Sequence, residues 1–382
     1  MLLSKGFEVE MYTGTPAGEV VGFSDKIVAA LEGFVREPDA RNVEYTTAPF
    51  CRYEHLLCEL IKPRVRLRDY LRTLGDYTLI PGSTLPLGGA QEFHRSDPQN
   101  PYHTYIENTY GTNVVTASIH INIGMSDLEE LMRACRLIRM EAPLYLALTA
   151  SSPFFDGQIT GFHSTRWQLF PQTPTHVPLF ESHLHHIRWV ESQLEQGTMQ
   201  SVRHLWSSVR PNGDRRPYNL NRLELRICDL VTNPLHLLAV TAFLEARLHQ
   251  MLKSPHLDPL EKSQIPAHNR SEDLLAIALA NEKSVAKDSL NAELRHWETG
   301  ETILASDWIR QLYAEIQPFA KQSGISCFLN PIQQILKTGN QAQQWLKQSE
   351  TSSLPQVLQQ AIVQMQYQER ELAQDICSPV AA

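Results

Sequence analysis

The sequence lacks the short motifs that identify the commonest nucleotide, metal and hydrolase sites. It contains no GxxxxGK[ST] and no GxGxxG after a predicted strand, which excludes a Walker-type phosphate loop and a dinucleotide-binding fingerprint. HExxH and GxSxG are absent too, so neither a zinc-protease helix nor a nucleophile elbow is present. If this protein binds a nucleotide, metal ions and arginines must hold its phosphates.

Long apolar and long basic runs are also missing. No apolar stretch approaches the roughly 20 residues that span a bilayer, and the net charge is −8 over 382 residues. We therefore expect no membrane and no nucleic-acid partner. The first predicted strand starts a few residues after Met1 and leaves no room for a signal peptide. We expect a cytoplasmic protein that is a monomer or a homodimer.

Paired cysteine motifs are the third absence. The six cysteines form no CxxC pair and show no zinc-finger spacing. In a chain of this length we expect them to be reduced thiols, with a Cys51–Cys58 disulfide left open as an alternative.

The composition, 42% hydrophobic and 20% charged, is typical of a globular protein of one large domain or two ordinary ones. We predict a mixed core of strands and helices over 1–254. A helical region without strands is expected over 255–382, packed on the core as one integrated domain. Four local predictions matter below: a helix over about 25–36, two helices over 53–62 and 64–74 around Pro63, a helix that starts at Asp127, and a polar loop over 207–219.

Four predicted strands have one apolar face and one polar face. In Gly6–Tyr12, Glu8 and Glu10 point one way while Phe7, Val9 and Met11 point the other, because side chains alternate across a strand. The same alternation recurs in 43–46, 117–123 and 223–227. If the strands share a sheet, its polar face gathers Glu8, Glu10, Glu44, His120, Asn122, Glu224 and Arg226.

A solvated sheet face is the plain alternative for each strand taken singly. Acidic residues are poor strand formers, however, and like charges on one face repel. A bound divalent cation removes that repulsion, and oxygen ligands in this number suit Mg²⁺ or Mn²⁺. His120 alone is more typical of a structural histidine, but its place between Ser118 and Asn122 favours a ligand. The polar face therefore predicts a metal site.

Arginines form a second group around these strands. Arg166, Arg210, Arg215 and Arg216 lie in predicted loops, and Arg226 lies in a strand. Arginine makes bidentate contacts with carboxylates and phosphates, whereas a loop arginine taken alone is normally solvated. Their position beside the acidic strands favours a rim that recognises anions.

Four motifs in order resemble those of the glutamate–cysteine ligases and related carboxylate–amine ligases. Gly6-Phe7-Glu8-Val9-Glu10 resembles their opening strand, and Ser118–Ile123 resembles their histidine-bearing central strand. Ser164-Thr165-Arg166-Trp167 is similar to their substrate-loop motif, and 223–229 to their Glu-x-Arg-x-x-Asp strand. The length and the helical C-terminal part resemble most the form found in cyanobacteria.

The resemblance implies an α+β fold related to glutamine synthetase. In that fold a curved, mainly antiparallel six-stranded sheet forms a funnel-shaped site, with helices on the outer side. It also implies ATP-dependent ligation of L-glutamate to L-cysteine through γ-glutamyl phosphate, the first step of glutathione synthesis, with two or three Mg²⁺ ions per site. The implied metal ligands are Glu8, Glu10, Glu44, His120 and Glu224.

The remaining implied roles concern catalysis and binding. Arg226 and Glu224 are the expected catalytic residues. Arg166, Arg210, Asn122 and Ser118 are the expected substrate and nucleotide contacts. Three other readings stay open: a ligase that uses a different amine, a metal-dependent phosphohydrolase and a metabolite sensor without activity.

Overall fold

The structure, a computed structural model, describes residues 2–266 and 268–377. Its centre is a seven-stranded sheet in the order β2-β3-β1-β5-β9-β8, with β4 also paired to β1, and all of these pairs are antiparallel. The strands of this sheet are β1 (Lys5–Gly14), β2 (Phe34–Arg36), β3 (Asn42–Thr46), β4 (Thr78–Ile80), β5 (Ile119–Gly124), β8 (Val209–Asn212) and β9 (Arg222–Leu225). The sheet thus has one strand more than the six expected.

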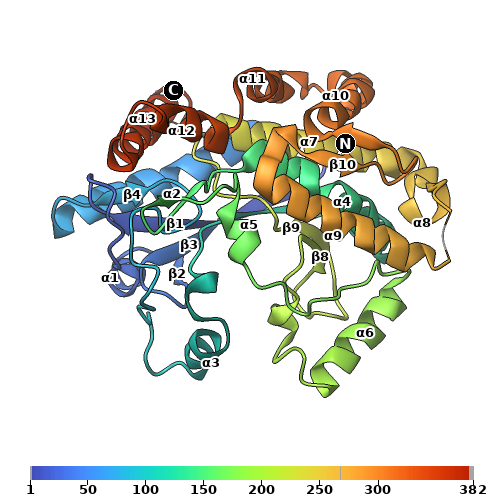
Figure 1. Ribbon diagram of the computed structural model, residues 1–382, viewed down its shortest axis with the longest axis horizontal. Helices are drawn as coiled ribbons and strands as arrows, with labels where there is room; N and C mark the ends of the chain where they lie inside the picture. The colour runs from blue at the N-terminus through green and yellow to red at the C-terminus, as the bar shows by residue number, and fades with distance from the viewer. Residues whose placement is uncertain (1, 267, 378–382) are drawn as a thin grey trace, which may run out of the picture.

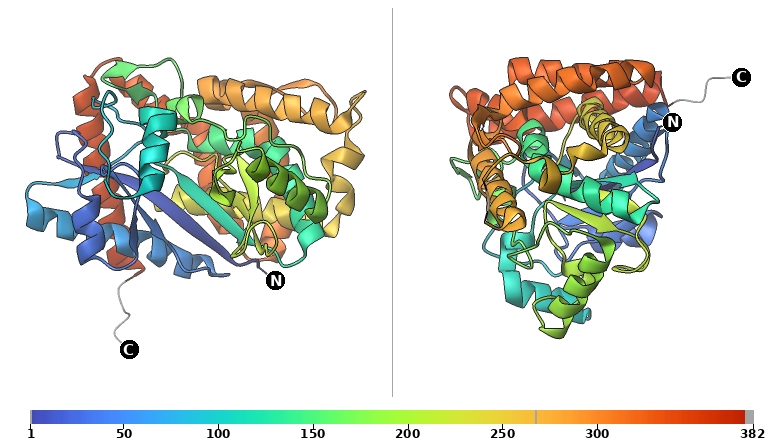
Figure 2. Two further views of the ribbon diagram at one scale, coloured as in Figure 1. Left: turned by 90° about the horizontal axis from the view of Figure 1, so that it is seen from below. Right: turned by 90° about the vertical axis from the view of Figure 1, so that its right-hand side faces the viewer.

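The apolar face of the sheet is the main core. Val9, Met11 and Ile121 are fully buried on this face. Helices cover it in two layers, while two segments project on the side of the opposite face (Figures 1 and 2). The inner layer contains α2 (Tyr53–Leu74), α4 (Leu128–Thr149) and α7 (Pro234–Lys253); the projecting segments carry α3 (Pro101–Tyr110) and α6 (His183–Glu195).

The outer layer comes mainly from the C-terminal part of the chain. There α9 packs on α4, α10 on α7 and α13 on α2, and a single hydrophobic core contains residues from both parts. The division at residue 254 stays a prediction. The bounds are α9 (Arg270–Asp288), α10 (Ala305–Gln322), α11 (Asn330–Thr338), α12 (Gln341–Ser349) and α13 (Leu354–Asp375); the remaining short elements are α1 (Ser24–Ala30), α5 (Thr165–Leu169), α8 (Pro259–Lys262), β6 (Phe154–Phe155), β7 (Gln158–Ile159), β10 (Glu293–Arg295) and β11 (Thr302–Leu304).

Helix starts follow local capping chemistry. The prediction that a helix begins at Asp127 is confirmed, because the Asp127 side chain accepts a hydrogen bond of 2.8 Å from the backbone N–H of Glu130. Of the residues from Ala134 to Thr149, all are buried, so α4 is the central helix behind the sheet.

Two helix predictions were wrong. The helix predicted over about 25–36 ends at Ala30, because Leu31 is extended and Gly33 takes a left-handed φ of 90° before β2. The two helices predicted around Pro63 are one continuous helix. A proline removes a single N–H, and buried leucines such as Leu60 and Leu67 on either side of it hold α2 to the core.

Two strand predictions were wrong as well. The loop predicted over 207–219 contains β8, which lies at the sheet edge, where Pro211 needs no ladder partner on its outer side. The C-terminal region, predicted to have no strands, contains the antiparallel hairpin β10–β11.

The cysteine prediction was wrong for one pair. Cys58 in α2 and Cys377 after α13 form a disulfide, whereas Cys51, Cys135, Cys228 and Cys327 are free. The two partners lie 319 positions apart in the sequence, so spacing gives no hint of the pairing. Within the described residues, none of the helices combines the length and the apolar character that crossing a membrane requires.

Candidate active site

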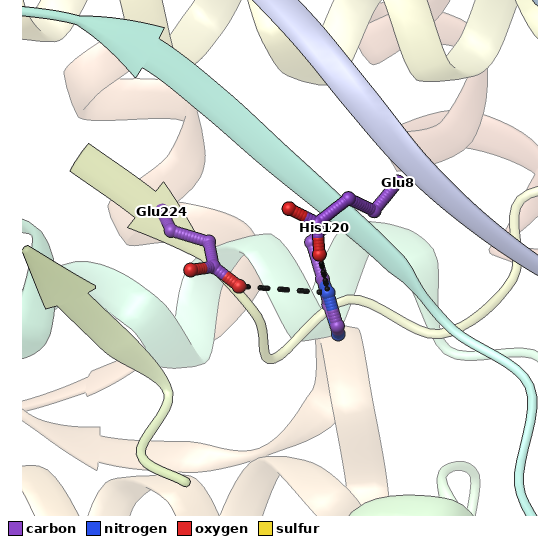
Figure 3. A group of neighbouring side chains, drawn as sticks. All are labelled: Glu8, His120 and Glu224. Atoms are coloured by element: carbon purple, nitrogen blue, oxygen red, sulfur yellow. Dashed lines mark hydrogen bonds and ion pairs between the residues drawn. The ribbon is translucent and has the colours of Figure 1, made fainter. Parts of the chain in front are cut away.

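The polar face of the sheet brings one histidine and two glutamates together from three strands. Glu8 lies on β1, His120 on β5 and Glu224 on β9, and their side chains converge (Figure 3). His120 Nδ1 lies 2.9 Å from Glu8 Oε2 and 3.6 Å from Glu224 Oε1. One ligand atom from each residue lies within 4.8 Å of the other two. We call this group the first cluster.

Two arginines pair with the carboxylate of Glu224, which is fully buried, and an asparagine donates a hydrogen bond to it. Arg210 donates to both carboxylate oxygens at 2.7 and 3.1 Å, and Asn212 donates at 2.6 Å. Arg226 Nη1 donates to Oε1 of the same carboxylate. Burial raises the pKa of Glu224, but the charges of Arg210 and Arg226 outweigh it and hold that pKa well below the ordinary value. Glu224 is therefore ionised in the folded protein.

Glu8 is compensated from the other side. Burial and the neighbouring Glu224 raise its pKa, yet the hydrogen bond to His120 and the charges of His120 and Arg226 give a net lowering. Asn122 also donates to Glu8 Oε1 at 3.3 Å. The first cluster thus holds two carboxylates in their charged form next to protein cations.

A second cluster consists of carboxylates alone. Glu10 on β1 and Glu44 on β3 pair directly across the sheet, and Glu37 follows β2. A carboxylate oxygen from each lies within 4.8 Å of the others. The pKa of Glu37 is raised to about 8, chiefly by burial and then by the charges of Glu10 and Glu8. Burial and the same kind of repulsion, first from Glu37, raise the pKa of Glu44 well above its ordinary value.

The donor sets of both clusters fit divalent cations. Carboxylate oxygens suit Mg²⁺ and Mn²⁺, and an imidazole nitrogen is compatible with Mn²⁺. The second cluster fits best, since a bound cation would remove the repulsion that raises the pKa values of Glu37 and Glu44.

The predicted metal-ligating residues therefore lie close together, in two groups rather than one. Glu37 was missed, because it lies between Arg36 and Pro38 in a segment predicted as the end of a helix. Ser118, predicted to contact substrate or nucleotide, lies beside both clusters: its hydroxyl donates to Glu10 at 2.7 Å and lies 3.1 Å from His120 Nε2. Its contact with a ligand stays a prediction.

Two of the predicted binding arginines have protein partners. Arg166 is buried and donates at 3.1 Å to the backbone carbonyls of both Arg226 and Ile227. Arg210 is occupied by Glu224 and by the backbone carbonyl of Leu205, at 2.9 Å. Both hold β9 or the residues directly after it, which carry Glu224 and Arg226, and direct substrate contact by either one stays a prediction.

An open cavity of about 690 Å³ starts at the first cluster. Glu8 and Asn122 are among the residues that line it, and it extends along the start of β1 and the ends of β3 and β5. The other residues that line it are Ser4, Lys5, Gly6, Phe7, Thr46, Thr47, Pro49, Gly124, Met125, Ser126, Asn221 and Arg222. Of its lining residues, only Glu8 belongs to either cluster.

Similarity to solved structures defines the fold of this protein. A glutamate–cysteine ligase from Francisella tularensis, solved in complex with AMP, superposes with a TM-score of 0.77 at 13% identity and covers 97% of this chain and 89% of its own. A bifunctional glutathione synthetase from Pasteurella multocida superposes with a TM-score of 0.73 at 15% identity, over 98% of this chain and 53% of its own. The fold is that of the glutamate–cysteine ligases, which confirms the predicted fold class.

The chain belongs to glutamate–cysteine ligase family 2, whose family model matches residues 4–377. A Rubrobacter xylanophilus protein named "Putative glutamate--cysteine ligase 2-1" is 28% identical over 283 residues, which cover 72% of this chain and 71% of that relative. The resemblance stated from the sequence is therefore confirmed, and the protein is a ligase of this family. The narrower assignment to the cyanobacterial form stays a prediction.

Proposed function

We propose that this protein ligates L-glutamate to L-cysteine with ATP, giving γ-glutamylcysteine, ADP and phosphate. The observation that carries the proposal is the pair of acidic clusters on one face of the sheet, in a chain of this ligase family. A carboxylate is a poor electrophile, so the γ-carboxylate of glutamate must be activated before an amine attacks it. Phosphorylation by ATP supplies that activation.

Two or three Mg²⁺ ions are the proposed metal complement. Glu8, His120 and Glu224 would hold one ion, and Glu10, Glu37 and Glu44 another. When bound, the ions neutralise phosphate oxygens and so lower the repulsion between an anionic nucleophile and an anionic triphosphate. A phosphohydrolase would need similar metals, but the family match favours ligation.

The cavity beside the first cluster is the proposed place for the nucleotide. Its volume of about 690 Å³ is in the range of ligand pockets, and it ends at Glu8, where the phosphates would approach the cluster. The second cluster lies on the other side of Glu8 along β1, so glutamate would enter from the side of Glu10, Glu37 and Glu44.

The proposed reaction has two steps, phosphorylation of glutamate and attack by the amine. An oxygen of the γ-carboxylate attacks the γ-phosphorus, the bond to the β-phosphate oxygen breaks, and ADP leaves. The amine of cysteine next attacks the acyl phosphate; the tetrahedral intermediate expels phosphate, and the amine loses a proton. Arg226, held by Glu224 and 3.3 Å from His120 Nδ1, is placed to stabilise the transferring phosphoryl group.

An ADP-release assay with defined amino acids tests this proposal. The protein is incubated with Mg²⁺, ATP and glutamate, with and without cysteine, and products are identified by mass spectrometry. We expect ADP release that needs both amino acids, with γ-glutamylcysteine as the product. ADP release with glutamate and another amine, but not with cysteine, would show that cysteine is not the acceptor. Phosphate release without any amino acid would favour a phosphohydrolase.

A further inference from the structure

The loop between β8 and β9 carries an arginine that the site described above does not use. The loop spans 213–221 and is anchored to α6 at two points: His183 Nε2 lies 2.9 Å from the carbonyl of Pro217, and the Tyr218 hydroxyl donates to Glu191 at 2.7 Å. Arg215 and Arg216 lie side by side in this loop. Arg215 is exposed, whereas Arg216 is half-buried.

Arg216 lies near the first cluster. Burial lowers its pKa, and the charges of Glu224 and Glu8 oppose this lowering, while those of Arg226 and Arg203 add to it. Both carboxylates of the first cluster are therefore electrostatic neighbours of this guanidinium.

The Nη1 atom of Arg216 is buried and has no hydrogen-bond partner among the described residues. Arg210 and Arg226 are paired with Glu224. Arg166 donates from both Nη atoms to backbone carbonyls, although its Nε is also a buried donor without a partner. A buried cationic donor without a partner is unfavourable unless an anion fills the position. Arg216 differs from Arg210 and Arg226 because, within the described part of the chain, no ion pair holds its guanidinium to a carboxylate of the first cluster.

The same loop borders the cavity that starts at Glu8. Asn221 ends the loop and Arg222 begins β9, and both line that cavity. Arg216 thus belongs to a loop whose last residue lines the cavity, and it lies near the cluster at which that cavity starts. An anion that extends from the cavity to the cluster would come near the guanidinium.

We propose that Arg216 binds the phosphate chain of the nucleotide at its β-phosphate, between the cavity and the first cluster. This rests on the proposed function, because it takes the cavity as the nucleotide site. A planar guanidinium donates two parallel hydrogen bonds to phosphate oxygens, which a lysine cannot reproduce in full. Arg216 then holds the group that departs as ADP, while Arg226 faces the phosphoryl group that is transferred.

Nucleotide binding without amino acids tests Arg216 directly. Affinities for Mg²⁺–ADP and for AMP are measured by calorimetry on the wild type and on Arg216→Ala, Arg216→Lys, Arg215→Ala and Arg188→Ala. We expect Arg216→Ala to weaken ADP binding by about 10-fold or more and to leave AMP binding unchanged, because AMP lacks the β-phosphate. Arg216→Lys should restore part of the affinity. Arg215→Ala tests whether the neighbouring arginine of the predicted rim contributes, and Arg188→Ala, which alters an exposed arginine of α6, is the control that should match the wild type.

Steady-state kinetics separate this role from a structural one. Arg216→Ala should raise the KM for ATP and leave the KM for glutamate unchanged, with an unaltered circular dichroism spectrum. Unchanged ADP affinity, an equal loss of AMP affinity, or a rise in the KM for glutamate alone would each overturn the assignment.

The two proposals fail in different ways. If the wild type forms γ-glutamylcysteine and Arg216→Ala keeps its ADP affinity, the role of Arg216 is refuted and the reaction stands. If ADP affinity depends on Arg216 but no dipeptide forms with cysteine, the contact between Arg216 and the phosphate stands, and cysteine is refuted as the amine acceptor. A wild type that binds no Mg²⁺–ADP overturns both.

Discussion

At the residue scale, the two clusters differ in how their negative charge is compensated. Glu8 and Glu224 of the first cluster have His120, Arg210 and Arg226 as protein partners. Among charges that affect Glu37 and Glu44, Arg226 is the cation and the rest are carboxylates. The first cluster is therefore preformed without metal, whereas the second gains most from a bound cation.

Removal of one charge from the first cluster should stop catalysis with the fold intact. We expect Glu8→Gln to lower kcat about 100-fold or more, because it replaces a proposed metal-ligating carboxylate with a neutral amide of similar shape. Steady-state ADP release measures this, and thermal unfolding checks the fold. Glu19→Gln, an exposed carboxylate shortly after the same strand, is the control. Near-normal turnover of Glu8→Gln would remove Glu8 from the metal site.

The raised pKa of Glu37 predicts a pH effect on stability. The unfolded chain releases this proton near the ordinary value of 4.5, and the folded protein near about 8. Because the folded state binds more protons in between, the metal-free protein should lose stability as the pH rises from about 4.5 to 8.

Thermal unfolding against pH, with and without Mg²⁺, measures this effect. Mg²⁺ should reduce the loss, because its binding favours the ionised carboxylates. Glu37→Gln should flatten the slope of the metal-free protein. Identical slopes for Glu37→Gln and the wild type would contradict the electrostatic account of the second cluster.

At the element scale, β1 is the strand on which both clusters depend, and its start is fixed by a buried ion pair. Lys5 Nζ lies 2.8 Å from Glu245 of α7, and both side chains are fully buried. The Glu245 carboxylate also accepts from the Tyr53 hydroxyl at 2.6 Å and from the backbone N–H of Leu3 at 2.6 Å. These contacts tie β1 to α2 and α7.

Breaking this pair should destabilise the protein by leaving a charge unpaired. We expect Glu245→Leu to lower the free energy of unfolding by about 3–5 kcal/mol, and Lys5→Met with Glu245→Leu to lower it less, because no charge is then buried alone. Chemical denaturation of both variants measures the difference. A double variant that is less stable than Glu245→Leu would contradict this reading.

The disulfide ties α13 to α2. We expect Cys58→Ser to lower the free energy of unfolding by about 2–4 kcal/mol, because the cross-link restricts the unfolded chain over a long loop. Cys51→Ser, which alters a free and exposed thiol, is the matched control. Equal stability of Cys58→Ser and the oxidised wild type would contradict a stabilising cross-link.

The elements differ in how far the sequence predicts them. Alternation alone identifies the strands with Glu8, His120 and Glu224, because each has an unbroken apolar face. It fails for β8, where Arg210, Pro211 and Asn212 hide the pattern of a four-residue edge strand. The Cys58–Cys377 bond also escapes, since it depends on how α13 packs on α2.

At the scale of the whole molecule, the helices make one face of the sheet a core and leave the other to the site (Figure 2). Residues far apart in sequence meet there: Glu8 and Glu224 both lie close to His120, and Arg166 donates to the carbonyl of Arg226, directly after β9. The sequence indicates that the polar strands share a face but not which carboxylates lie together. Pairing order decides that, because β2 and β3 bring Glu37 and Glu44 to Glu10.

The proposed reaction requires the polar face of the sheet to phosphorylate the γ-carboxylate of glutamate and then to transfer the γ-glutamyl group to an amine. Glutamate labelled with ¹⁸O in its γ-carboxylate, incubated with Mg²⁺, ATP and cysteine, tests this most directly. The account predicts that one ¹⁸O atom appears in each released phosphate, because phosphate leaves from the acyl carbon with a former carboxylate oxygen. Phosphate without ¹⁸O would show that water, and not the γ-carboxylate, attacks ATP, and would contradict the account.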